Sequence, residues 1–414
     1  AINPLDLGCE CSESGCEASQ WLRTDSLLQR SWIPAPRSEE WSEPPGPVPT
    51  MMEGACSENV AEGVLIGAGH ELKLLRGSKA APEVVWVSRS GVFLRAEPLG
   101  TQPVAAVADG PGDQVAVAFE NGIVQVVPGG STIHARGSNS TFTIPPKAPW
   151  PLGGTRTMGR LWTSGVWMSW LTRVGQDMPI WEWARFDEGT AHFKGQGAVV
   201  RCGQPLFQGH KMKWNPDGGG AEVEPLEGGA GEGWAVLGDP LDEPHCAALG
   251  DHGILVLTGR IWGFQALVIH DDDEHPAQPH DYDKHTDGWQ LVLLQPSESL
   301  LEPRVVGRTV LVSAPGESVR DRHGNEVQAA GAVYVIEKLD GRWTVKTRVV
   351  SAKPETCGLF GFSVGLDGGE LYVNQVRRRP LAPPDTRRTT SFEPVVCRFQ
   401  LETRTGANPS DGPM

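Results

Sequence analysis

The chain has 414 residues, of which 39% are hydrophobic and 21% charged, and its formal net charge at pH 7 is −15. This composition indicates a globular chain with a substantial core, neither disordered nor membrane-spanning. No run reaches the roughly 20 apolar residues that a transmembrane helix needs. Because an acidic surface repels phosphate backbones and anionic lipid headgroups, nucleic acid and bare membrane are excluded as expected partners.

Turn residues are abundant, since the chain holds 51 glycines and 34 prolines. Residues 1–58 are a separate segment: Cys, Ser and Glu dominate up to Glu17, and Pro34–Pro49 resembles an extended linker without a core of its own. From about Val60 the sequence changes to short β-branched runs cut by Gly, Asp and Pro, which predict strands. We therefore predict an N-terminal extension over 1–58, an all-β domain over 59–403 and a flexible tail over 404–414.

The eight cysteines predict a disulfide framework, because their number is even and their spacing does not form paired CxxC zinc knuckles. Proximity along the chain suggests that the four N-terminal cysteines pair among themselves and that the other four form two neighbouring pairs. The predicted groups are Cys9, Cys11, Cys16 and Cys56, then Cys202 with Cys246, and Cys357 with Cys397. Disulfides form in oxidising compartments, so we expect an exported, extracellular or cell-surface protein.

A repeat is clearest in the C-terminal third. Glu302–Gly316 is a strand, a turn and a strand that ends at Ala-Pro-Gly, and Ala330–Ile336 is the next strand. The turn Leu339–Gly341 leads into the strand Arg342–Val345, and a further unit opens with Leu359–Val373. Short apolar runs separated by Gly and Asp turns are typical of all-β repeat architectures.

This pattern resembles the FG-GAP repeat, the blade of integrin-α-type β-propellers, over roughly Pro303–Asn374. The matching motifs are Phe-Gly-x-Ser-Val from Phe360, Asp-Gly at Asp367, Ser-Ala-Pro at Ser313 and Gly-Ala-Val-Tyr-Val from Gly331. The resemblance implies a β-propeller that binds a protein or glycan partner through loops on its rim.

Weaker matches to the same repeat occur closer to the N-terminus. Candidate blade starts fall near residues 60, 104, 158, 198, 244, 302 and 360. Their spacing is within the range of a four-stranded blade with its loops. We predict a seven-bladed propeller, with six blades as the alternative, and expect N-terminal residues around Gln20–Leu28 to complete the last blade and close the ring.

The stretch His270–His285 holds four of the eleven histidines and a dense set of carboxylates. Imidazole with carboxylate binds transition metals, and carboxylate alone suits calcium, so a divalent metal is the one cofactor that the sequence suggests. The alternative is a solvated charged loop. The candidate ligands are His270, Asp272, His275, His280, Asp283 and His285.

Calcium loops of the form Asp-x-Asp-x-Asp-Gly occur in many FG-GAP repeats, but no intact copy is present here. We interpret Asp109–Asp113 and Asp367–Gly369 as tight turns instead, because Gly and Asp tolerate positive φ. Of the 15 tryptophans, most are expected in the core, while Trp214 and Trp262, beside turn-rich loops, are candidates for partner contacts.

Catalytic signatures are not found: the sequence has no Gly-x-Ser-x-Gly elbow and no nucleotide-binding Gly loop before a helix. We therefore expect a binding or adhesion protein that recognises a protein or glycan at the cell surface. A propeller-type lyase or hydrolase, acting at the channel mouth or through the His/Asp stretch, is the alternative, because propellers host both classes.

Overall fold

The structure of the chain is a computed structural model. It describes residues 10–12, 15–17, 52–56, 58–78, 81–102, 104–119, 123–128, 132–134, 156–164, 167–174, 180–185, 202–204, 206–207, 210–215, 220–225, 234–236, 241, 243–250, 253–261, 264–271, 289–294, 302–380 and 390–401. Their regular structure is almost entirely β-strand, so the all-β prediction is confirmed. Within these ranges, no helix has the length and apolar character required to cross a bilayer.

The described strands form seven sheets of three to five strands and two small hairpins. The first two sheets are β5 (Val64–Ala68), β6 (Glu71–Ser78), β7 (Ala81–Ser88) and β8 (Phe93–Pro98), and then β9 (Val104–Asp109), β10 (Val115–Phe119), β11 (Ile123–Val127) and β12 (Thr132–His134). The third and fourth are β13 (Arg156–Ser164), β14 (Trp167–Val174) and β15 (Ile180–Arg185), and then β17 (Leu206–Phe207), β18 (His210–Asn215), β19 (Gly220–Pro225) and β20 (Trp234–Val236).

The remaining three large sheets each include a strand from elsewhere in the chain. The fifth is β16 (Cys202–Gln204), β21 (Glu243–Leu249), β22 (Leu255–Ile261), β23 (Phe264–His270) and β24 (Trp289–Leu293). The sixth is β25 (Glu302–Val306), β26 (Thr309–Ala314), β29 (Ala332–Leu339), β30 (Arg342–Ser351) and β3 (Met52–Cys56). The seventh is β31 (Val364–Asp367), β32 (Glu370–Pro380), β33 (Thr390–Gln400) and β4 (Glu58–Glu62).

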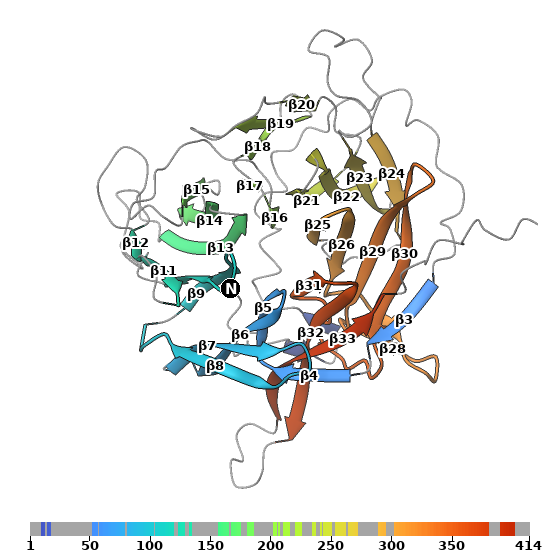
Figure 1. Ribbon diagram of the computed structural model, residues 1–414. Helices are drawn as coiled ribbons and strands as arrows, with labels where there is room; N and C mark the ends of the chain where they lie inside the picture. Colours follow the sequence, from blue (N-terminus) through green and yellow to red (C-terminus); the bar gives the residue numbers. More distant parts are fainter. Residues whose placement is uncertain are drawn as a thin grey trace, which may run out of the picture.

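The sheets follow one another around a central axis in chain order, as Figure 1 shows. The first strands of the first six sheets contact each other in turn, from β5 with β9 and β9 with β13 to β21 with β25. The sixth sheet packs on the seventh through a shared core, and β31 of the seventh sheet returns to contact β5. Within each sheet, consecutive strands of the chain pair mainly as antiparallel neighbours. This closed ring of radial sheets is a β-propeller.

The core lies between sheets rather than inside one of them. Leu65 and Leu72 of the first sheet are buried against Tyr372 and Val396 of the seventh, and the buried Val333 of the sixth sheet packs against the seventh in the same way. A strand whose two faces are both covered by neighbouring sheets has no reason to alternate apolar with polar residues. This explains continuous apolar runs such as Val115–Phe119, in which all five residues are buried.

One N-terminal segment spans the sixth and seventh sheets. Strand β3 pairs in parallel with β30, and β4 pairs antiparallel with β33, so the two strands cover the outer edges of neighbouring sheets. We call Met52–Glu62 the latch. The segment Gln20–Leu28, which we expected to complete the ring, lies outside the described residues.

A disulfide joins the latch to the seventh sheet. Cys56 of β3 and Cys397 of β33 form it, with a Cα–Cα distance of 5.9 Å and a sequence separation of 341 residues. The predicted Cys357–Cys397 pair is therefore wrong, as is the pairing of Cys56 within the N-terminal group. Cys357 lies outside this disulfide as a buried thiol. Proximity in sequence failed as a guide because ring closure brings the two ends of the domain together.

The other cysteines are described in part. Cys246 is disulfide-bonded, and in the parallel pairing of β16 with β21 its Cα partner is Cys202. In the small hairpin of β1 (Glu10–Ser12) and β2 (Gly15–Glu17), Cys11 is the Cα partner of Cys16. Cys9 lies outside the described residues. The remaining predicted pairings stay predictions.

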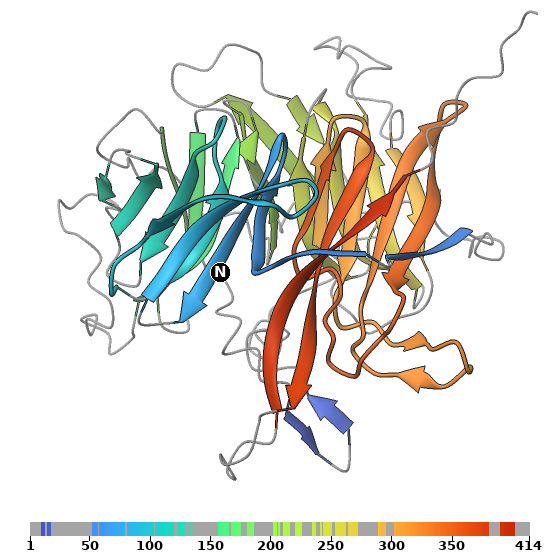
Figure 2. The ribbon, with the colours of Figure 1, turned by 60° about the horizontal axis from the view of Figure 1, so that its bottom comes forward.

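Figure 2 shows elements that project from one end of the ring, two of which extend from the sixth and seventh sheets. One is the hairpin of β27 (Val319–Arg320) and β28 (Glu326–Val327), and the other is the far part of the 11-residue strands β32 and β33. The buried carboxylate of Glu317 anchors the base of the first hairpin, because it accepts hydrogen bonds from the Tyr334 hydroxyl at 2.8 Å and the Arg348 guanidinium at 2.6 Å. We call this the hairpin end of the ring.

Candidate functional site

The opposite end of the ring is formed by tight turns. Because strand directions alternate within a blade, the first-to-second and third-to-fourth connections emerge at the same end. They include Gly69–His70 and Arg89–Val92 of the first sheet, Gly110–Gln114 of the second and Gly368–Gly369 of the seventh. We call this end the turn face.

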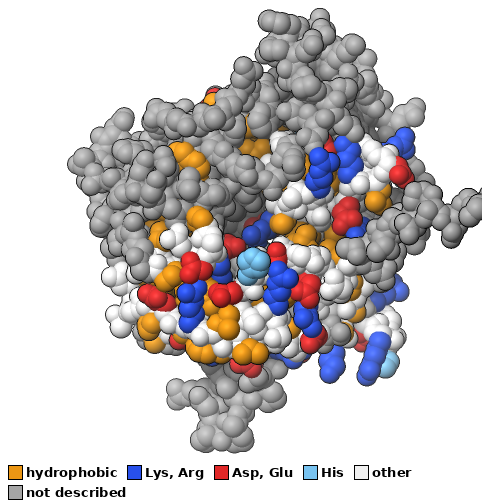
Figure 3. Space-filling view, in the orientation of Figure 1, with side chains coloured by type: hydrophobic (Ala, Val, Ile, Leu, Met, Phe, Trp, Pro, Cys, Tyr) orange, Lys and Arg blue, Asp and Glu red, His pale blue; other side chains and the backbone are white. Residues whose placement is uncertain are grey.

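Figure 3 looks onto the turn face. The middle of this face is hollowed, and acidic, basic and histidine side chains border the hollow. Propellers present their functional loops around such a central mouth or on the surrounding rim, because a rigid stack of strands can hold variable loops there. A functional site is therefore expected among the described residues of the turn face.

The connection between β7 and β8 is a rigid hairpin at the rim. The Ser88 N–H donates to the Val92 carbonyl at 2.8 Å, and the Gly91 N–H donates to the Ser88 carbonyl at 2.9 Å. Gly91 has φ +85°, and a Cβ there would come within 1.8 Å of the Val60 carbonyl oxygen of the latch. Only glycine fits this position, because positive φ and close backbone approach act together. We call Ser88–Leu94 the rim hairpin.

Three consecutive apolar side chains on the rim hairpin face solvent. Val92 is 62% exposed, Phe93 is 59% exposed and Leu94 is 46% exposed, and they are the large hydrophobic residues exposed within the described part of the chain. Other described strands, such as β10, bury every residue. Large apolar side chains that stay exposed, where most other described apolar residues are buried, mark a candidate interaction site.

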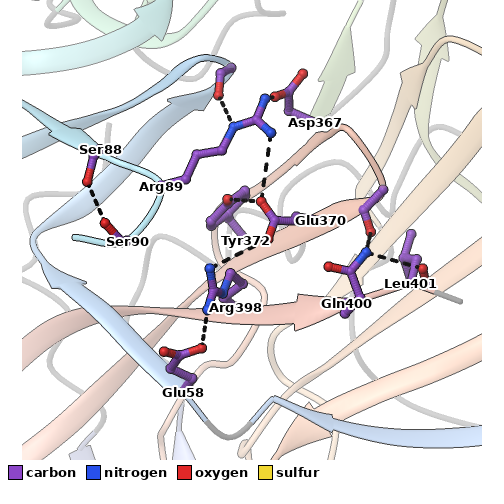
Figure 4. A network of polar contacts seen from close by, with 12 residues as sticks. Glu58, Ser88, Arg89, Ser90, Asp367, Glu370, Tyr372, Arg398, Gln400 and Leu401 are labelled. Carbon is purple, nitrogen blue, oxygen red and sulfur yellow. Dashed lines mark hydrogen bonds and ion pairs between the residues drawn. The ribbon is translucent and has the colours of Figure 1, made fainter. Parts of the chain in front are cut away.

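A charged cluster ties the rim hairpin to the seventh sheet, as Figure 4 shows. Arg89 forms an ion pair with Asp367 and a longer one, at 3.9 Å, with Glu370, while its Nε donates to the Gly69 carbonyl at 3.0 Å. Arg89 therefore links the β5–β6 turn, the rim hairpin and the β31–β32 turn. A planar guanidinium with several donors suits this bridging role better than an ammonium.

The same cluster continues to the latch. Glu370 accepts from the Tyr372 hydroxyl at 2.7 Å and pairs with Arg398 at 3.5 Å, and Arg398 donates to Glu58 at 2.5 Å. Burial first, and then the hydrogen bond to Glu370, raise the pKa of Tyr372 above its usual range. The hydrogen bond from Arg398 to Glu58, with the nearby carboxylate charges, raises the pKa of the guanidinium. The cluster fixes the seam at which the ring closes.

The Asp109–Gln114 turn holds a lysine from the neighbouring sheet. Lys73 of β6 is buried, and its Nζ lies 2.6 Å from Asp109 Oδ1, 2.6 Å from the Gly112 carbonyl and 3.0 Å from the Gln114 carbonyl. The Lys73 ammonium therefore neutralises the turn and joins the first two sheets.

The same turn is also held by contacts from Trp86 and Arg95 of the first sheet. The Trp86 indole N–H donates to the Asp113 carbonyl at 2.9 Å, and the Arg95 guanidinium lies 4.5 Å from the Trp86 ring centroid. Arg95 also donates to the Asp113 carboxylate at 2.8 Å, and this hydrogen bond lowers the pKa of Asp113 below its usual range. Asp109–Asp113 is thus a turn filled by side chains of the first sheet.

The predicted metal loop leaves the ring at the turn face. His270 ends β23 and is half-buried, and the next residue, Asp271, is buried with its carboxylate 2.9 Å from Lys338 Nζ. Asp272, His275, His280, Asp283 and His285 lie outside the described residues. Among the residues that the structure describes, no group of three His, Cys, Asp or Glu side chains is placed to hold a metal ion.

The tryptophan candidates are described only in part. Trp214 lies on β18, where the backbone alone is described, and Trp262 lies between β22 and β23, outside the described ranges. Sequence reasoning missed Val92, Phe93 and Leu94, because a Val-Phe-Leu run after a Ser-Gly turn is typical of any buried strand. Their exposure follows from the position of β8 at the outer edge of its sheet.

Comparisons with known proteins do not place the chain in a family: no family model matches, and no curated protein matches. Several solved structures are loosely similar. YCF48 bound to a D1 peptide is 13% identical, with 83% of this chain and 95% of that chain covered and a TM-score of 0.41. An uncharacterised protein, lmo1340 of Listeria monocytogenes EGD-e, is 10% identical, with 78% and 94% covered and a TM-score of 0.42. Apo AztD of Citrobacter koseri is 10% identical, with 80% and 84% covered and a TM-score of 0.40.

Proposed function

We propose that the chain is an exported, seven-bladed propeller of the FG-GAP type whose turn face binds a protein or glycan partner at the cell surface. The observation that carries the proposal is the exposed apolar trio of Val92, Phe93 and Leu94 on the rigid rim hairpin. Large apolar side chains that stay exposed cost solvation free energy, so a soluble surface keeps them for a partner.

The way in which the ring is closed supports the same proposal. The latch and the Cys56–Cys397 disulfide join the sixth and seventh sheets, and the Arg89 cluster joins the first sheet to the seventh. A scaffold closed in this way presents its rim loops in a fixed geometry, which lowers the entropy lost on binding. The disulfide also favours an oxidising compartment, and hence export.

The experiment is retention of partners on the immobilised, oxidised protein. Cell-surface protein extract and a glycan array are offered to the protein with and without EDTA. The control carries Arg320→Ala and Arg322→Ala on the β27–β28 hairpin, at the opposite end of the ring.

We expect saturable retention of one partner by both the original protein and this control. Loss of the partner in EDTA would add a divalent metal to the interface and point to the loop 271–288. Absence of any saturable retention, or its loss in the hairpin-end control, contradicts a turn-face binding module. A propeller-type lyase or hydrolase then becomes the function to assay.

A further inference from the structure

The surroundings of the rim hairpin indicate the chemistry of a partner that binds the turn face. Three features of the rim hairpin determine what kind of surface can cover Val92, Phe93 and Leu94: its rigidity, the blocked edge of β8 and the sign of the nearby charge.

The rim hairpin is ordered before any partner arrives. Val92 is held by its carbonyl, which accepts from the Ser88 N–H, and by its N–H, which donates to Ser88 Oγ at 3.0 Å. Gly91 lies against the backbone of Val60, and Arg89 is fixed by the seventh sheet. The apolar trio is therefore a preformed protrusion, and a partner needs a complementary apolar surface rather than an induced fit.

The edge of β8 is unsuited to pairing with an added strand. The register between β7 and β8 shifts at Trp86/Val87, which places a bulge beside Leu94. Further along β8 come Arg95, Glu97 and Pro98, and proline has no N–H to donate. Bulges, charged residues and proline are the devices that protect a sheet edge from pairing. Recognition must therefore occur through side chains rather than through strand addition.

The charge around the trio is negative. The charged side chains at this end of the first and seventh sheets and on the neighbouring turn include six carboxylates and four cations: Glu58, Glu71, Asp109, Asp113, Asp367 and Glu370, with Lys73, Arg89, Arg95 and Arg398. Each cation is paired with one or more of these carboxylates, so the surplus is acidic, in keeping with the net charge of −15. Such a border repels acidic peptides and anionic lipids and attracts lysine and arginine.

We propose that the rim hairpin binds a protein segment with an apolar core flanked by basic residues. Val92, Phe93 and Leu94 contact the apolar side chains, and Glu71 and Asp113 lie next to the flanking cations. This inference rests on the proposed function and deepens it, because it assigns the partner class for the same face of the ring.

The test uses synthetic fluorescein-labelled peptides, each with the same core of Leu, Val and Phe. One set carries two lysines at each end, one carries two serines and one carries two glutamates. Binding to the oxidised full chain is measured by fluorescence polarisation at low and high salt. The variants are Phe93→Ser at the patch and Arg322→Ala at the hairpin end, and circular dichroism checks that both are folded.

We expect the lysine-flanked peptides to bind most tightly and the glutamate-flanked peptides most weakly, with the difference reduced at high salt. Phe93→Ser should weaken binding of the lysine-flanked set about tenfold or more, while Arg322→Ala leaves it unchanged. Because Phe93 is largely exposed, its substitution should leave the fold intact.

Two results would overturn the inference: equal binding of the three peptide sets, or binding that Phe93→Ser does not change. If no peptide binds but the immobilised protein still retains a surface partner saturably, the proposed function stands and this partner class is wrong. If neither assay shows binding, both are wrong.

Discussion

The Cys56–Cys397 disulfide yields the most direct prediction on stability. It joins the latch to β33 across 341 residues of chain and is buried in the core between the sixth and seventh sheets. By the chain-entropy relation, cross-linking a loop of this length disfavours the unfolded chain by about 6 kcal/mol at 25 °C. Removal of native disulfides usually costs ~2–5 kcal/mol, so we expect a loss of about 4 kcal/mol in the double variant Cys56→Ala with Cys397→Ala.

The loss should begin at the latch. Without the disulfide, β3 and β4 are held by edge pairing and by surface contacts such as that of Arg398 with Glu58, so Met52–Glu62 should open before the ring unfolds. Guanidinium unfolding measures the free energy, and hydrogen exchange measures opening of the latch. The matched control is Cys357→Ala, which removes a buried thiol outside this disulfide. An unchanged unfolding midpoint in the double variant, or latch exchange as slow as in the oxidised protein, would refute this reasoning.

The remaining predictions concern buried charged groups. Lys73→Met should destabilise the chain by about 3 kcal/mol, because Asp109 and the turn carbonyls lose their cation; the exposed Lys353→Met is the control, and thermal unfolding checks both. Arg348→Met should cost ~3–5 kcal/mol, because it leaves Glu317 buried without its ion pair. Tyr334→Phe removes one hydrogen bond and should cost about 1 kcal/mol. If denaturant unfolding shows a larger loss of stability for Tyr334→Phe than for Arg348→Met, Arg348 is not the main partner of Glu317. Burial, and then the charge of Glu317, raises the pKa of Tyr334, and burial also raises the pKa of Tyr372. At high pH the folded chain therefore keeps phenol protons that the unfolded chain releases. Stability should thus fall as pH rises above about 10; absorbance titration of the tyrosines tests this, and ionisation of both phenols in the folded protein would contradict it.

Local patterns in the sequence located the starts of four of the seven large sheets, while the expected starts near 60, 198 and 360 precede β5, β17 and β31 by four, eight and four residues. The expected starts near 104, 158, 244 and 302 lie within two residues of the first residues of β9, β13, β21 and β25. Apolar runs cut by Gly and Asp turns depend on neighbours along the chain, so they can be read without the fold. The same holds for Asp109–Asp113, where the Gly and Asp residues predict a turn and the structure has one.

Contacts across the ring could not be predicted from these local patterns. Cys56 meets Cys397 because the ring closes between the ends of the domain, and Lys73 enters the Asp109 turn because the two sheets pack side by side. Exposure of Phe93 depends on which strand lies at the sheet edge. No spacing along the chain encodes these relations, since each depends on the order of sheets in space.

The measurement that tests the central claim most directly is site-specific photo-crosslinking. A photoreactive phenylalanine analogue is placed at position 93 on the turn face or at position 322 on the hairpin end, and each oxidised protein is mixed with cell-surface extract. The account predicts one crosslinked partner from position 93, displaced by an excess of the unlabelled chain and absent from position 322. Equal crosslinking at both positions, or none that the unlabelled chain displaces, would contradict a binding module that acts through its turn face.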